Sequence, residues 1–145
     1  MPKLIIFLGN KAISCDTIVP IALAINNINN KKKIIFYCFN KPTYNFIIQN
    51  TVLYSAIKKV AKLKRFGGSS SESFLKYFYK IYWAYRLFLI SINGLLFKDK
   101  FIHFGALEKW PLRIISYLNP SNVIYLEANC WGWNKRIYNI ADINR

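Results

Sequence analysis

Four short apolar runs, each bounded by polar residues or glycine, divide the chain at fairly regular intervals. They cover residues 4–8, 34–39, 101–104 and 122–126. Uninterrupted apolar runs of this length are typical of strands buried on both faces, as in a parallel sheet. The pattern therefore predicts four buried parallel strands.

Segments whose apolar residues recur at helical spacing lie between these runs. The first helix is predicted to begin near Asp16, which can cap it, so that Pro20 falls in its first turn. The same spacing predicts further helices over residues 42–49, 52–63, 70–97 and 108–118. Alternating strands and helices predict an α/β fold, an open parallel sheet of about four or more strands with helices on both faces. The 145 residues suffice for one such Rossmann-like domain, residues 1–145.

The longest predicted helix, residues 70–97, has a continuous apolar side. An amphipathic helix turns such a side toward the core. The residues of this side, taken at about 100° per residue, are Phe74, Phe78, Ile81, Tyr85, Phe88, Leu89, Ile92 and Leu96. The opposite side carries Lys76 and Lys80, but also Trp83, Leu87 and Ile90. These apolar residues fit burial against a further neighbour or contact with a membrane surface. The longest charge-free run covers about half of the roughly 20 residues that a membrane span needs, so we expect no span.

The chain is strongly basic, with 21 lysines and arginines, 6 acidic residues and a formal net charge of +15. Such an excess predicts an anionic partner, which can be nucleic acid, an acidic lipid surface or a phosphorylated ligand. Heavy use of Ile, Asn and Lys also follows from an AT-rich coding sequence, so part of the charge can be compositional. No nucleic-acid-reading motif is present, and we expect no nucleic-acid partner.

The basic residues are densest between positions 58 and 65. A solvated helix face is one interpretation of this run. The other is an acidic-lipid interface shared with the aromatic helix. The candidate membrane-facing residues are Lys58, Lys59, Lys62, Lys64, Arg65, Lys76, Lys80 and Trp83.

Candidate chemistry lies where predicted strands end, because open α/β sheets bind ligands beyond the carboxyl ends of their strands. Asp16, after the first strand, and Glu127, after the fourth, are the candidate catalytic bases. Helix capping is the alternative role for Asp16. The candidate ligand-binding residues form two groups. The loop residues Gly9, Asn10 and Lys11 can hold an anion. Trp131 and Trp133 can stack on a sugar or a nucleobase, or they can fill space in the hydrophobic core.

No metal or cofactor motif is present. The three cysteines lie far apart, and His103 is the single histidine. We therefore expect no metal site and no cofactor, and we expect His103 to be packed inside its strand rather than catalytic. Unpaired, scattered cysteines fit a reducing cytoplasm.

The layout of residues 3–25, 33–44, 100–115 and 122–133 resembles the N-terminal Rossmann-like half of a GT-B glycosyltransferase of bacterial surface-polysaccharide and capsule synthesis. The resemblance implies that this half binds the acceptor, often a lipid-linked glycan, and that a loop of this half supplies the base, here Asp16 or Glu127. The nucleotide-sugar donor would bind a second domain. Because no second half follows in the 145 residues, we expect a separate donor-binding domain or chain as partner, or a truncated gene product inactive alone.

Three functions follow as expectations. The first is the acceptor-binding half of a glycosyltransferase, cytoplasmic and peripheral at the inner face of the membrane. The second is a non-enzymatic basic α/β protein that binds an acidic membrane surface or a phosphorylated ligand. The third is a small nucleotide- or phosphate-binding domain that uses residues 9–16.

Overall fold

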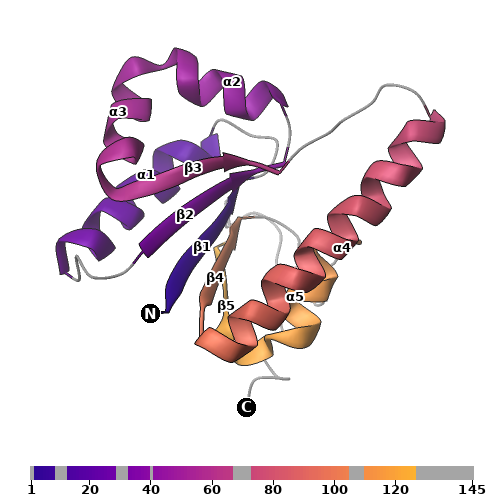
Figure 1. Cartoon of the computed structure of the whole chain (residues 1–145). Helices are drawn as coiled ribbons and strands as arrows, with labels where there is room; N and C mark the ends of the chain where they lie inside the picture. Colours follow the sequence, from indigo (N-terminus) through magenta and orange to yellow (C-terminus); the bar gives the residue numbers. More distant parts are fainter. Residues whose placement is uncertain are drawn as a thin grey trace, which may run out of the picture.

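The computed structural model describes residues 2–8, 13–28, 33–39, 41–66, 73–104 and 110–126. Within them, five parallel strands form one sheet in the order β3-β2-β1-β4-β5 (Figure 1). The strands are β1 (Lys3–Leu8), β2 (Lys33–Cys38), β3 (Ala61–Arg65), β4 (Lys100–Phe104) and β5 (Val123–Leu126). The predicted open parallel α/β sheet is thereby confirmed.

The helices cover the two faces of the sheet in two groups (Figure 1). One face carries α1 (Ile13–Ile28), α2 (Lys41–Gln49) and α3 (Thr51–Val60). The other face carries α4 (Ser73–Phe97) and α5 (Arg113–Leu118). A single 3-10 turn, η1 (Pro120–Asn122), connects α5 to β5. Asn50 caps α3, and its side-chain oxygen accepts a hydrogen bond from the Leu53 backbone N–H at 3.0 Å.

Two hydrophobic cores follow from the alternation of side chains along the strands. On β1, Leu4, Ile6 and Leu8 face α1–α3, whereas Ile5 and Phe7 face α4 and α5. All five are buried, which explains why the sequence of a central strand is apolar without alternation. Each large side chain buried in this way stabilises the fold by about 1.5–3 kcal/mol.

The end of the predicted helix over residues 52–63 was wrong. The helix ends at Val60, and Ala61–Arg65 is an edge strand that pairs in parallel with β2. Its residues alternate: Ala61 and Leu63 pack on the core beneath α3, while Lys62 and Lys64 are exposed. Pairing with β2 outweighs the helix propensity of lysine and leucine, and lysines on an edge strand discourage pairing with other sheets.

The expected start of the first helix was also wrong. It begins at Ile13, so Asp16 is its fourth residue rather than its cap, and Pro20 lies in its interior. Without an N–H, Pro20 cannot donate the helical hydrogen bond to the carbonyl of Asp16. The predicted loop residues 9–12 lie outside the described residues.

The largest correction concerns the orientation of α4. The side expected to face the core points outward, and Phe78, Tyr85 and Phe88 are each at least 45% exposed. The opposite side, with Leu87 and Ser91 both fully buried, packs on the sheet. Figure 1 shows α4 leaving the sheet at its amino-terminal end, and residues 67–72, which were expected to include the helix start, lie outside the described part.

The helix predicted over residues 108–118 is confirmed only for Arg113–Leu118. A turn covers residues 110–112, and residues 105–109 lie outside the described part. Asn119 ends α5, and its side-chain amide donates a hydrogen bond to the buried carbonyl of Ser91 at 3.2 Å, which connects the end of α5 to α4.

Candidate functional site

The order of the strands places the most favourable ligand-binding position between β1 and β4. These strands are neighbours, yet the chain continues from β1 toward β2 on one side and from β4 toward β5 on the other. The helices that follow β1 and β4 therefore lie on opposite faces of the sheet. In open α/β sheets, ligands bind beyond the carboxyl ends of the strands at such a point.

Below this position, on the face covered by α4 and α5, lies a cluster of aromatic rings. Phe7 stacks with Phe39 at a centroid distance of 5.5 Å and with Tyr37 at 5.9 Å. His103, 4% exposed, has its ring 6.4 Å from that of Phe7. The histidine is thus packed within its strand, next to the carboxyl ends, as its position in an apolar run predicts.

Trp83, a predicted membrane-facing residue, belongs to the same cluster and packs toward the sheet. Its ring lies 5.6 Å from that of Phe39 and 6.2 Å from that of Phe66. The side chain is partly buried against the sheet. Sequence periodicity missed this because Trp83 shares a helix side with two lysines.

Arg86 connects α4 to Phe66, the residue that follows β3, through a hydrogen bond and a ring contact. Its guanidinium donates a hydrogen bond to the carbonyl of Phe66 and lies 4.7 Å from the centre of the Phe66 ring. The same group lies 5.6 Å from the centre of the Tyr82 ring. Burial raises the pKa of nearby Tyr37, and the positive charge of Arg86 partly opposes that rise.

The candidate catalytic and ligand-binding residues stay predictions. Asp16 lies in the first turn of α1, the element that follows the carboxyl end of β1, but its side chain is not among those described. The others lie outside the described residues: Gly9, Asn10, Lys11, Glu127, Trp131 and Trp133.

The basic run at positions 58–65 does not form one surface. Lys58 and Lys59 are exposed in the last turn of α3. Lys62 and Lys64 project from β3 on the opposite face of the sheet, toward α4, whereas Arg65 alternates back to the side of α3. On α4, Lys80 is exposed, and the side chain of Lys76 is not described.

A cavity of about 270 Å³ lies between α4 and the sheet, and four lysines line it. Two of them, Lys3 and Lys33, begin β1 and β2 and were not singled out from the sequence. The remaining lining residues are Ile5, Ile35, Tyr37, Lys62, Lys64, Ile90, Asn93 and Asp99. Strand register was the missing signal, because Lys3 pairs with Lys33 and Tyr37 pairs with Lys64 only once the strands are aligned.

The described residues hold no cluster of three or more His, Cys, Asp or Glu side chains placed to bind a metal ion. Among the helices that the structure describes, none combines the length and hydropathy needed to cross a bilayer. Comparison with protein families, curated proteins and solved structures found no match to this chain.

Proposed function

We propose that this chain is the acceptor-binding, Rossmann-like half of a glycosyltransferase that builds surface carbohydrate. The observation that carries the proposal is the strand order β3-β2-β1-β4-β5, in which the direction of the connections reverses between β1 and β4. The sugar-transfer assignment rests on the resemblance of four stretches of the sequence to GT-B enzymes, and the fold is compatible with it.

In this proposal the acceptor lies above the carboxyl ends of β1 and β4. Asp16, in the first turn of α1, accepts the proton of the acceptor hydroxyl while the oxygen of that hydroxyl bonds to the anomeric carbon of the donor sugar. The bond from that carbon to the nucleoside diphosphate breaks, and the diphosphate leaves with the donor-binding domain. The residues of this chain thus bind and orient the acceptor.

Binding of lipid-free oligosaccharide acceptors, followed by amide chemical shifts, tests the location of the site. We expect the perturbed amides to cluster at the ends of β1 and β4, near Leu8 and His103. Shifts confined to other regions, or no shifts with any acceptor of a broad panel, would count against the proposal.

A transfer assay tests the chemistry, with the donor-binding domain supplied as a second polypeptide. We expect Asp16→Asn to lower kcat by about 10²–10⁴-fold while acceptor binding persists, as for loss of a general base. Full activity of Asp16→Asn would remove Asp16 from this role.

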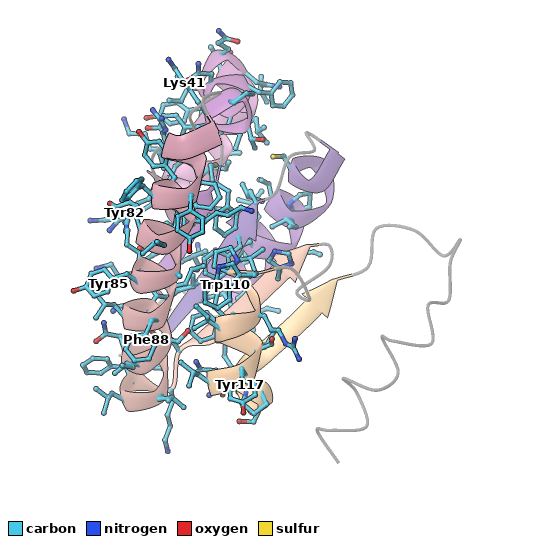
Figure 2. The ribbon with its side chains drawn as sticks, turned by 90° about the vertical axis from the view of Figure 1, so that its right-hand side faces the viewer. Lys41, Tyr82, Tyr85, Phe88, Trp110 and Tyr117 are labelled. Carbon is cyan, nitrogen blue, oxygen red and sulfur yellow. The ribbon has the colours of Figure 1, made fainter. Side chains whose placement is uncertain are left out.

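A second function, attachment to an acidic membrane surface, is favoured by the outer face of α4. This outer face consists of side chains that are at least 36% exposed: Phe78, Ile81, Tyr82, Tyr85, Phe88, Leu89, Ile92 and Leu96. Figure 2 shows Tyr82, Tyr85 and Phe88 following one another along the helix. A helix of 25 residues is about 37 Å long, so an apolar face of this extent exceeds what isolated surface residues produce.

Charge favours a lipid surface over a second copy of the chain as the occupant. The sequence of α4 contains no acidic residue, and Lys80 and Lys98 are exposed near its two ends. A second copy would bring another net charge of +15 to this face, whereas anionic headgroups would bring opposite charge. Exposed aromatic rings flanked by lysines suit a helix that lies in the interface of a bilayer.

Flotation with vesicles containing phosphatidylserine tests this function. We expect the protein to float with them, to float less as salt rises, and to lose flotation in the double variant Tyr85→Ser, Phe88→Ser. Phe46→Ser is the matched control, because Phe46 is 41% exposed on α2 and Phe88 is 45% exposed on α4. Equal flotation of all three proteins would eliminate the outer face as the attachment surface.

A further inference from the structure

We propose that the cavity between α4 and strands β1, β2 and β3 binds the phosphate group of a small phosphorylated molecule. It is a site separate from the proposed acceptor position at the carboxyl ends of β1 and β4. The cavity begins at the opposite ends of these strands, where Lys3 and Lys33 are the first residues.

Strand pairing brings the four lysines to one cavity. Lys3 pairs with Lys33 across β1 and β2, Ile35 with Lys62, and Tyr37 with Lys64 across β2 and β3. Paired residues of neighbouring strands lie about 4.8 Å apart and project to the same face. Three adjacent strands therefore deliver lysines from one side of the sheet.

Among the described residues, positive side chains outnumber carboxylates around this cavity. Four lysines line the cavity against one carboxylate, Asp99. Asp99 is 1% exposed, its Oδ1 accepts a hydrogen bond from the backbone N–H of Lys3 at 2.6 Å, and its Oδ2 has no hydrogen-bond partner. No ion pair joins any of these lysines to a carboxylate among the described residues. Like charges around one cavity repel one another, and a bound phosphate would relieve that repulsion.

The remaining wall indicates the size and character of the ligand. Ile5, Ile35 and Ile90 supply an apolar floor, and the Lys64 ammonium lies 6.0 Å from the centre of the Tyr37 ring. The volume of about 270 Å³ is just below the roughly 300–1,000 Å³ of common ligand sites. It therefore suits a phosphate group with one small ring or chain, and is too small for a dinucleotide. Asn93 can bind a hydroxyl of such a molecule.

Calorimetric titration with inorganic pyrophosphate tests the site in the intact chain. We expect saturable binding that weakens at least tenfold in the double variant Lys62→Ala, Lys64→Ala. The matched control is Lys58→Ala, Lys59→Ala, which removes the same charge from α3, outside the cavity. Because Lys62 and Lys64 lie on an edge strand, the single variant Lys33→Ala, at the start of a different strand, provides an independent test and should also weaken binding.

A parallel vesicle arm distinguishes a free phosphorylated molecule from a lipid headgroup. The probe is phosphatidylcholine vesicles that contain phosphatidic acid, compared with phosphatidylcholine alone. If the cavity takes a lipid headgroup, the Lys62, Lys64 variant loses both pyrophosphate and vesicle binding. If it takes a free molecule, only pyrophosphate binding falls.

Two results would overturn the proposal. One is equal weakening of pyrophosphate binding in the cavity and α3 double variants, which would mean attraction to net charge alone. The other is the absence of pyrophosphate binding by the unaltered chain.

Discussion

At the residue scale, β2 places two titratable groups in opposite cores. Tyr37 faces α4, and Cys38 faces α1, where the buried Cys15 is its neighbour in the same core. Burial raises the pKa of the Cys38 thiol to about 12, and Cys15 adds to that rise. The thiolate is the nucleophilic form of cysteine, so this residue is inert in the folded chain despite being free.

The raised pKa of Cys38 predicts a specific loss of stability at alkaline pH. Folding favours the protonated thiol, so its contribution is complete below the unfolded pKa of about 8.5 and is lost as pH rises toward the folded value of about 12. We therefore compare the urea midpoints of the unaltered chain and of Cys38→Ala between about pH 9 and pH 11, which lies between the two pKa values. We expect the midpoint of Cys38→Ala to fall less steeply with pH than that of the unaltered chain. Lysine titration is common to both proteins and cancels in the comparison.

Alkylation with iodoacetamide at pH 9 gives an independent reading of the same residue, with peptide mapping to separate it from the other cysteines. Cys38 should stay unmodified in the folded chain and react in urea. Rapid native labelling, or identical pH slopes for the two proteins, would contradict the burial argument.

At the element scale, α4 is apolar on two sides, and the side that packs on the sheet has small residues where it meets β4. Ser91 and Gly94 lie on the inner side, and a Cβ at position 94 would approach Phe101 at 2.4 Å. The larger apolar side could not come as close to β4. Close approach of the helix axis to the sheet therefore decides the orientation, and this depends on residue size as well as hydrophobicity.

Gly94→Ala should destabilise the protein although alanine favours helices by about 1 kcal/mol over glycine. The added methyl group would displace the fully buried ring of Phe101, and overpacking of this kind costs about 1–3 kcal/mol. We expect a lower urea midpoint with an unchanged slope.

A double-mutant cycle tests whether Phe101 causes that loss. In a Phe101→Leu background, which shortens the clashing side chain, Gly94→Ala should cost less. The same cost in both backgrounds would show that the clash is not with this ring.

At the scale of the whole molecule, the fold separates an apolar surface from concentrated charge. The outer face of α4 is apolar, while lysines gather in the cavity beside it and on α3. Trp110 and Tyr117, which are 61% and 80% exposed, extend the apolar character toward α5 (Figure 2). A net charge of +15 opposes association with other copies and favours anionic partners.

That net charge predicts an increase in thermal stability with salt. Repulsion among like charges is stronger in the compact state than in the expanded unfolded chain, and added sodium chloride screens it. We expect Tm to rise from low to physiological ionic strength. A Tm that falls over this range would indicate that attractive charge pairs outweigh the repulsion.

Much of the sheet was predictable from local patterns, because buried parallel strands leave uninterrupted apolar runs. The runs around Ile5, Phe36, Ile102 and Ile124 all became strands. β3 was not predicted, because its residues Lys62 and Lys64 have good helix propensity. Its alternation of buried and exposed side chains is recognised only once it is paired with β2. The candidate bases and loop residues were chosen because they follow predicted strands. Asp16 is the one member of this set within the described residues, and only its backbone is described.

The sequence by itself determined the fold class, since the periods of its apolar residues distinguish buried strands from helices and their alternation requires a parallel sheet. Only the tertiary structure decided which side of α4 is buried, because both sides are apolar and the packing distance to Phe101 makes the choice. It also decided where the charge acts: Lys3, Lys33 and the pair Lys62 and Lys64 lie about 30 residues apart in the sequence, and strand register brings them to one cavity.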